Sequence, residues 1–206
     1  MTGLVTRWWW IRHAPVSNPG GRIYGATDVP ADTTDEATFR NLARQLPDGA
    51  VWVTSHLKRT KQTAEALRRV GCDVPSKPAI EPHLGEQNFG AWHGRTYGEI
   101  EREIGLHQFW LAPANHRPPD GESFVDLIDR VVPAIQRLTV SHRGRDIVCV
   151  AHGGTIRAAV GHALSVDPEA SLRVSVANLG LTRLDHIPTE TGPGAWRVAW
   201  LNLQPK

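Results

Sequence analysis

Short apolar runs alternate along this chain with segments in which apolar residues recur every three or four positions. Runs rich in aromatic and β-branched residues are typical of strands, and apolar residues at helical spacing are typical of helices that bury one face. Four runs predict strands, at residues 7–12, 51–55, 77–80 and 147–151. Four segments predict helices, at residues 33–46, 60–70, 122–141 and 155–164. This alternation predicts an α/β fold, a three-layer α/β/α sandwich around a mostly parallel central sheet.

The last part of the chain predicts a different arrangement of strands. Residues 179–186 and 196–203 are apolar runs on either side of Gly192-Pro193-Gly194, a sequence that favours a turn. We therefore expect an antiparallel pair there, which adds an antiparallel strand to the sheet. Its outer edge could pair with a second copy in a homodimer or be covered within the chain, and the sequence leaves both open.

Residues 81–121 interrupt the alternation of strands and helices. Glycine and proline recur through this segment, and only two short helices are expected, at residues 97–103 and 107–111. We interpret the segment as an excursion from the sheet that caps the functional site. The whole of residues 1–206 is expected to form one domain, because the length fits a single core.

A second long loop follows the first predicted strand. Residues 14–33 contain several glycines and prolines and show no helical spacing. Loops of this length inside a domain are usually functional. Thr33 and Glu36 match the spacing of a capping box, which predicts that the first helix starts there.

Composition and charge argue against several classes of function. The formal net charge is only +2 and the basic residues are scattered, so no nucleic-acid partner is expected. No apolar run approaches the roughly 20 residues that span a membrane, and the run at residues 8–11 is too short for a signal peptide. Two cysteines, Cys72 and Cys149, give no disulfide framework. A cytoplasmic protein without membrane contact is expected.

Polar side chains occur where three of the predicted strands end. Arg12 and His13 follow the first strand, Arg59 follows the second, and His152 follows the strand at residues 147–151. The carboxyl ends of parallel strands meet at one edge of a sheet, so these side chains can converge. Arginine binds phosphate oxygens in pairs, and a helix that starts after His152 would add backbone donors. The pattern predicts a site for a phosphoryl group.

Each of these residues, taken singly, also has an ordinary explanation that involves no catalysis. A lone histidine at a strand end is more often structural, a lone Arg59 is more often a surface cation, and a glycine-rich loop with one Glu86 is common. The prediction depends on all of them at consistent positions in the topology. Only His13 and His152 among the histidines have such a position, and no His-Glu-x-x-His run occurs, so no metal site is expected.

Four blocks follow one another in a fixed order along the chain. They read Arg-His at residues 12–13, Ser-x-Leu-x-Arg-Thr-x-x-Thr-Ala at 55–64, Glu-x-x-Phe-Gly-x-Trp-x-Gly at 86–94 and Ala-His-Gly-Gly at 151–154. This set resembles the histidine phosphatase superfamily, also called the phosphoglycerate mutase-like family. The loop at residues 21–28 is similar to the short phosphatase branch that includes α-ribazole phosphatase-like proteins.

The resemblance implies a role for each matched residue. His13 would be the nucleophile that becomes phosphohistidine, with its other ring nitrogen donating to a nearby carbonyl. Arg12, Arg59 and His152 would hold the phosphoryl oxygens. Glu86 would protonate the leaving alkoxide and then activate water. No metal and no cofactor are required, because the arginines supply the positive charge.

Four further residues are candidates for substrate binding. Asn18 resembles a loop asparagine that contacts the phosphoryl group in many relatives, Gly153 opens the helix after His152, and Tyr24 and Trp92 would shape the leaving-group side. The chain departs from the family at residues 14–16, where Ala-Pro-Val stands in place of the usual Gly-Glu continuation. This departure removes one candidate polar contact to the substrate.

A small-molecule phosphomonoester is the expected substrate, and hydrolysis is the expected reaction. Between Glu86 and Asp120 the chain is short, aromatic and proline-rich, with only scattered arginines, whereas classical cofactor-dependent mutases carry a longer basic insertion there. A phosphoglycerate mutase-type phosphotransferase is one alternative. A regulatory or binding member with low activity is another, although every matched residue is present.

Overall fold

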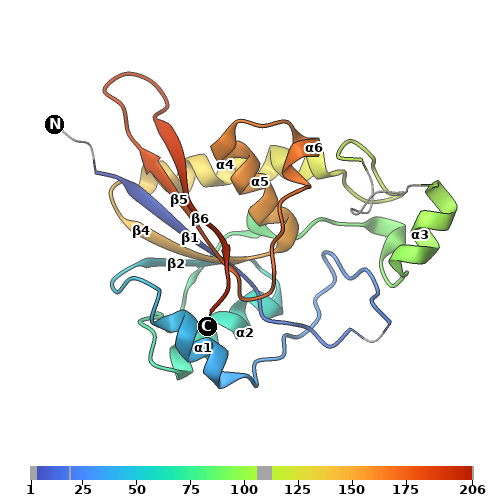
Figure 1. The fold of residues 1–206 in the computed structure, drawn as a ribbon, viewed down its shortest axis with the longest axis horizontal. Helices are drawn as coiled ribbons and strands as arrows, with labels where there is room; N and C mark the ends of the chain where they lie inside the picture. The colour runs from blue at the N-terminus through green and yellow to red at the C-terminus, as the bar shows by residue number, and fades with distance from the viewer. Residues whose placement is uncertain (1–3, 19, 106–112, 206) are drawn as a thin grey trace.

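A six-stranded sheet with the order β3-β2-β4-β1-β5-β6 forms the centre of the computed structural model, which describes residues 4–18, 20–105 and 113–205 (Figure 1). The strands are β1 (Thr6–Arg12), β2 (Val51–Thr54), β3 (Ala79–Ile80), β4 (Asp146–Ala151), β5 (Leu181–Ile187) and β6 (Ala195–Leu203). The helices are α1 (Glu36–Ala43), α2 (Lys58–Arg69), α3 (Tyr97–Ile104), α4 (Phe124–Ser141), α5 (Gly153–Leu164) and α6 (Pro168–Ser171), with 3-10 helices η1 (Pro82–Leu84) and η2 (Gly90–Trp92).

The strand directions agree with the predicted mostly parallel sheet. Strands β3, β2, β4 and β1 are parallel neighbours, β5 runs antiparallel to β1, and β6 runs antiparallel to β5. Strand β5 is therefore the one that runs against the others. The antiparallel pair expected at the end of the chain is confirmed, with β6 at the edge of the sheet.

Strand β1 separates two hydrophobic clusters, because successive side chains of a strand point to opposite faces. Trp8 and Trp10 belong to the cluster on the side of α4 and α5, and their rings stack with centroids 4.8 Å apart. Trp9 and Ile11 belong to the cluster on the side of α1 and α2. Figure 1 shows these helix pairs on opposite faces of the sheet. The predicted three-layer sandwich is confirmed.

Strands β1 and β4 end side by side. Arg12 pairs with Ala151 in the parallel register, and His13 continues the ladder by donating from its backbone N to the Ala151 carbonyl at 3.0 Å. Strand β2 lies on the other side of β4, with Thr54 opposite Val150. The segments that follow all three strands therefore meet at one edge of the sheet.

Several predicted boundaries need correction. The capping box at Thr33 is wrong: the helix begins at Glu36, and Asp35 is its N-cap, because the Asp35 carboxylate accepts from Thr38 N at 3.1 Å. Helix α5 starts at Gly153, two residues earlier than predicted. The four-residue helix α6, with Asp167 as N-cap, was not predicted. The helix expected at residues 107–111 lies outside the described residues.

The described part of the segment at residues 81–121 carries η1, η2 and α3 and adds no strand to the sheet. It has a small cluster of its own, in which Ile23 from the loop after β1 packs with Trp92 and Ile100. Figure 1 shows α3 at the far side of this excursion, away from the sheet. Within the described residues, no helix combines the length and the apolar character needed to cross a membrane.

Candidate active site

His13 is held as a neutral imidazole with a defined tautomer. Its Nδ1 lies 2.7 Å from the Ala14 carbonyl oxygen. A carbonyl only accepts, so Nδ1 carries the hydrogen and the lone pair is on Nε2. The pKa of His13 is lowered to about 3, mainly because the ring is buried, and Arg59 and Arg12 add to this effect while the Ala14 hydrogen bond opposes it. The ring therefore keeps an unprotonated nitrogen at neutral pH.

His152 lies next to His13, with ring centroids 5.3 Å apart. Arg59 donates from Nε to His152 Nδ1 at 3.3 Å, so Nε2 of His152 carries the hydrogen and donates to Ser55 Oγ at 2.8 Å. Burial, with the nearby Arg59 charge, lowers the pKa of His152 well below its ordinary value. Both ring nitrogens of His152 thus contact protein groups, and the ring orients Arg59.

Arg59, in the first turn of α2, is fully buried. It donates to the carbonyls of Gly25 at 2.6 Å and Thr27 at 2.7 Å, and its guanidinium lies 5.1 Å from the centre of the Tyr24 ring. Burial lowers the pKa of Arg59, and Glu86 acts in the opposite direction. Arg59 therefore connects the histidine pair to the loop after β1.

Arg12 offers a donor that no described residue uses. Its Nη1 donates to the Val176 carbonyl at 2.6 Å, whereas its Nε is buried without a hydrogen-bond partner among the described residues. Buried donors are nearly always satisfied, so an unsatisfied one needs an explanation such as a bound anion. A Cβ added at Gly153 would lie 3.7 Å from this Nε. The guanidinium of Arg12 therefore lies against the first turn of α5.

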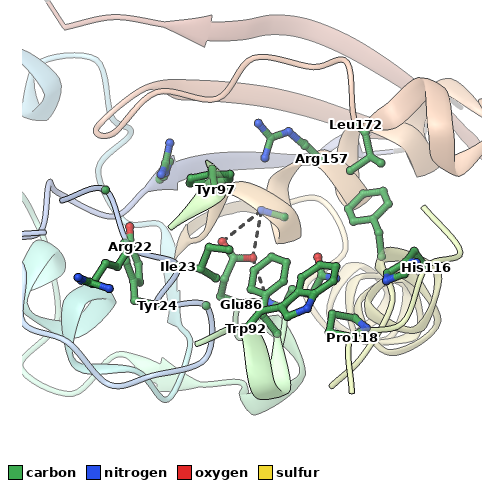
Figure 2. Close-up of a pocket in the computed structure, with 18 of the residues that line it drawn as sticks. Arg22, Ile23, Tyr24, Glu86, Trp92, Tyr97, His116, Pro118, Arg157 and Leu172 are labelled. Atoms are coloured by element: carbon green, nitrogen blue, oxygen red, sulfur yellow. Dashed lines mark hydrogen bonds between the residues drawn. The ribbon is translucent and has the colours of Figure 1, made fainter. Parts of the chain in front are cut away.

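The Glu86 carboxylate lies at the N-terminus of α5. Gly154 N donates to Glu86 Oε1 at 3.1 Å and to Oε2 at 3.3 Å, as the dashed lines in Figure 2 show. Helix N-termini favour negative groups. A Cβ at Gly154 would lie only 2.5 Å from Glu86 Oε1, so a glycine is needed for this approach. Glu86 and Arg12 are thereby placed at the same end of the same helix.

Arg130 of α4 fixes the backbone that carries Glu86. It donates to the Glu86 carbonyl at 3.0 Å and to the Gly85 carbonyl at 3.1 Å, and it forms an ion pair with Glu122 at 2.6 Å. Glu122 in turn accepts from Asn88 N at 2.9 Å. The loop before and after Glu86 is thus joined to α4 by charged groups, which sequence reasoning did not identify.

A cavity of about 550 Å³ opens beside these residues. Arg12 and Glu86 line it, whereas His13 and Arg59 do not and are almost completely buried. Tyr24 lines the cavity and lies beside both, with its ring centroid 6.3 Å from that of His13. The side of the cavity near Tyr24 is therefore the side on which a phosphoryl group would reach His13.

Known proteins share this sequence and this fold. The sequence pattern of the histidine phosphatase superfamily (branch 1) matches residues 8–203. The chain belongs to the histidine phosphatase superfamily. A bifunctional protein of Mycobacterium tuberculosis is 34% identical over 159 residues, which is 73% of this chain and 42% of that protein. The chain thus spans about two fifths of the length of that relative.

Other similar proteins match over nearly the full length of this chain. A probable phosphoglycerate mutase of Serratia proteamaculans is 27% identical over 194 residues, 91% of this chain and 88% of that protein. The structure of a mycobacterial glucosyl-3-phosphoglycerate phosphatase has a TM-score of 0.80 at 26% identity, covering 97% of this chain and 100% of that one. A putative alpha-ribazole-5'-P phosphatase from Escherichia coli has a TM-score of 0.77 at 25% identity, covering 96% of each chain. The family resemblance is confirmed, and the similar proteins include phosphatases and a probable mutase.

The structure brings the four predicted substrate-binding residues to the cavity, which is lined by Asn18, Tyr24, Trp92 and Gly153 among others. Asn18 already uses its amide within its own loop, donating to the Arg22 carbonyl at 2.7 Å and accepting from Arg22 N at 3.1 Å. Trp92 is only 1% exposed, and its ring stacks on His116 at 5.2 Å. Trp92 therefore supports the wall more than it forms the wall's surface.

Two features complete the description of the site. Arg157 of α5 lines the cavity and received no role from the sequence, although it stands four residues after Gly153, a spacing that puts both on one face of a helix. No group of three or more His, Cys, Asp or Glu side chains in the described part of the chain is arranged to hold a metal ion.

Proposed function

We propose that the protein hydrolyses small phosphomonoesters through a phosphohistidine on His13. The observation that carries the proposal is the hydrogen bond from Nδ1 of His13 to the Ala14 carbonyl, which leaves the lone pair on Nε2 beside two arginines. A nucleophile needs this unprotonated nitrogen, and the adjacent guanidiniums match the charge of a phosphoryl group.

In the first step, Nε2 of His13 attacks phosphorus, a P–N bond forms, and the ester P–O bond breaks. Arg12 and Arg59 stabilise the charge on the non-bridging oxygens, with the free Nε of Arg12 as one donor. His152 orients Arg59 through Nδ1, and the contact to the phosphoryl group that the family resemblance implies for it requires Nε2 to leave Ser55 Oγ. Glu86, in its protonated form, gives its proton to the leaving alkoxide.

In the second step, water replaces the departed alcohol. Glu86, now a carboxylate, accepts a proton from this water while the oxygen of the water attacks phosphorus. The P–N bond breaks, inorganic phosphate leaves, and Nε2 of His13 regains its lone pair. The place of Glu86 at the cavity surface, beside Gly154, suits both roles because water and substrate both reach it.

A mutase-type phosphotransferase is the second candidate, because one relative over most of the chain is a probable phosphoglycerate mutase. That reaction needs the phosphohistidine to be transferred back to an alcohol rather than to water. The short segment between Glu86 and Asp120 and the likeness to phosphatases of known structure favour hydrolysis.

A panel of phosphomonoesters assayed with and without 2,3-bisphosphoglycerate separates the two reactions. Hydrolysis predicts release of inorganic phosphate without this cofactor, unchanged by a chelator, and loss of turnover in His13→Asn. The His142→Asn variant, at the end of α4 and away from the cavity, is the matched control and should keep full activity. Isomerised products that appear only with bisphosphoglycerate, or full activity of His13→Asn, would contradict the proposal.

A further inference from the structure

The peptide group that joins His13 to Ala14 is held at both ends by side chains. At its N–H end, Ala14 N donates to Thr63 Oγ1 of α2 at 2.9 Å, and this hydroxyl donates to the Arg59 carbonyl at 2.7 Å. At its other end, the His13 carbonyl accepts from Nδ2 of Asn178 at 2.8 Å. Because Asn178 lies in the segment before β5, two elements far apart in the sequence fix the plane of this peptide.

The turn that carries Asn178 is strained and is held against the end of β1. Leu179 has a φ of 58°, in the left-handed region that a bulky side chain rarely adopts. Leu179 N donates to the Arg12 carbonyl at 3.0 Å, and the Gly180 carbonyl accepts from Arg12 N at 3.3 Å. A conformation of this kind costs free energy and persists only where surrounding contacts hold it, and it often lies at functional sites. The turn thereby keeps Asn178 in reach of the residue after Arg12.

Pro15 restricts the next carbonyl, which is the hydrogen-bond partner of the His13 ring. A residue that precedes proline favours an extended backbone, so Pro15 limits the directions in which the Ala14 carbonyl can point. Ala14 is buried and does not adopt a positive φ, and its carbonyl lies 2.7 Å from Nδ1 of His13. Pro15 itself is exposed, and its carbonyl accepts from Asp32 N at 2.6 Å. The departure of this chain from the usual family sequence therefore lies at the acceptor of the His13 hydrogen bond.

The position of this carbonyl decides which nitrogen of His13 carries the hydrogen. A neutral imidazole can hold its hydrogen on either nitrogen, and the partner of one nitrogen sets the choice. If the carbonyl turns away, the hydrogen is free to move to Nε2, which then has no lone pair for an attack. Neither Pro15 nor Asn178 lines the cavity, so both act through His13 rather than on a substrate.

We propose that Pro15 and Asn178 are positioning residues that hold the Ala14 carbonyl against Nδ1 of His13 and so keep the lone pair on Nε2. Asn178 fixes the peptide group before Ala14, and Pro15 fixes the carbonyl after it. The effect on catalysis rests on the proposed function, in which Nε2 attacks phosphorus. The effect on the ring itself does not depend on that reaction.

NMR of protein labelled with nitrogen-15 in its histidines reads the tautomer directly. The signals of His13 are identified by their loss in His13→Asn. In the wild type at neutral pH, Nδ1 should have the chemical shift of a protonated nitrogen and Nε2 that of an unprotonated one. Pro15→Ala and Asn178→Leu should each shift both signals toward a mixture of the two tautomers.

The same two variants should slow the phosphorylation of His13. In a rapid-mixing assay with 4-nitrophenyl phosphate, the burst rate should fall about 3- to 10-fold, the effect of one neutral hydrogen bond, with little change in KM. Pro75→Ala, which removes another exposed proline, and Asn41→Leu, which removes an amide that accepts from Arg44 in α1, are the matched controls. Neither residue lines the cavity, and both variants should keep the tautomer and the rate of the wild type.

The tautomer decides the outcome. A wild-type His13 that carries its hydrogen on Nε2 would overturn the inference. An unchanged tautomer in Pro15→Ala or in Asn178→Leu would overturn it for that residue, even if the rate falls. Altered tautomers in a protein that hydrolyses no phosphomonoester would support the positioning and contradict the proposed function alone. Pro15→Ala changes an exposed residue and is expected to fold, and Asn178→Ala takes the place of Asn178→Leu if that variant does not fold.

Discussion

Gly154→Ala tests whether the Glu86 carboxylate performs acid–base chemistry where the structure places it. A Cβ at this position would lie 2.5 Å from Glu86 Oε1 and 2.9 Å from Leu127 Cδ2, whereas ordinary contacts lie at 3.4–4 Å. The carboxylate must therefore withdraw by about 1 Å, and it loses its hydrogen bonds to Gly154 N. A catalytic group displaced by about 1 Å can cost about 100-fold in rate.

The stability of the Gly154→Ala variant should change much less than its activity. Alanine in place of glycine within a helix contributes up to about 1 kcal/mol. The lost contact of a carboxylate with the helix N-terminus opposes this by about 0.3–1 kcal/mol, and the crowding against Leu127 adds a cost of about 1–3 kcal/mol. These effects partly cancel, so the variant is expected to fold.

The assay compares glycerol 3-phosphate with 4-nitrophenyl phosphate. The first has an alkoxide leaving group that needs a proton, and the second has a phenolate that departs without one. Gly154→Ala should lose about 100-fold on the alkyl ester and clearly less in the phosphorylation of His13 by the aryl ester. Gly98→Ala, where a Cβ meets no atom within 4 Å, is the matched control in another helix. Full activity of Gly154→Ala on both esters would refute the role assigned to Glu86.

Two further predictions concern the histidine pair and the loop of Glu86. The pKa of His13 is lowered to about 3 and that of His152 well below its ordinary value, so both stay neutral when folded, whereas the unfolded chain binds protons below about pH 6.5. The free energy of unfolding should therefore fall as the pH drops from about 6.5 toward 3, by up to about 1.4 kcal/mol per pH unit for each histidine. In denaturant titrations His13→Asn should show a shallower fall, and identical slopes would contradict this. Arg130→Met should lower kcat about tenfold or more with little change in KM, because the Glu86 backbone is released, and Arg130→Lys should restore part of it. Arg137→Met removes an arginine of the same helix that pairs with Glu81, and it should not lower kcat. An equal loss of kcat in this variant would indicate a general effect on α4.

The sheet and the residues at its edge could be predicted because strand periodicity and topology determine them together. Once β1 and β4 are parallel neighbours, Arg12 and Ala151 fall in register, and His13 and His152 must leave the sheet side by side. The alternation of Trp8, Trp9 and Trp10 between two cores follows from the same pleat. These conclusions need only the local pattern of apolar residues and the rule that the carboxyl ends of parallel strands meet at one edge of a sheet.

Other parts depend on contacts between segments that sequence spacing does not encode. Arg130 reaches the Glu86 loop across 44 positions of chain, and no local pattern marks it. Thr33 matched a capping box, yet the Asp35 carboxylate took the cap because it also accepts from the Thr38 hydroxyl. The amide of Asn18 is used by Arg22, which depends on how the loop closes.

The lining of the cavity was also only partly predictable from the sequence. The sequence pointed to aromatic residues in the excursion, and among the described ones Phe89, Trp92 and Tyr97 line the cavity. Further lining comes from α5 and the segment after α6, where Arg157 and Arg173 enter. The spacing of Arg157 from Gly153 would have placed it on the correct helix face, but nothing in the sequence shows which loop covers that face.

The most direct test of the account is to trap the phosphoenzyme. Wild-type protein mixed with a radiolabelled phosphomonoester and quenched within milliseconds should carry label that is stable in base and lost in acid, as expected of phosphohistidine. Peptide mapping should place it on His13, and His13→Asn should carry none. Turnover without such an intermediate, or label on another residue, would contradict the assignment of His13 as the nucleophile.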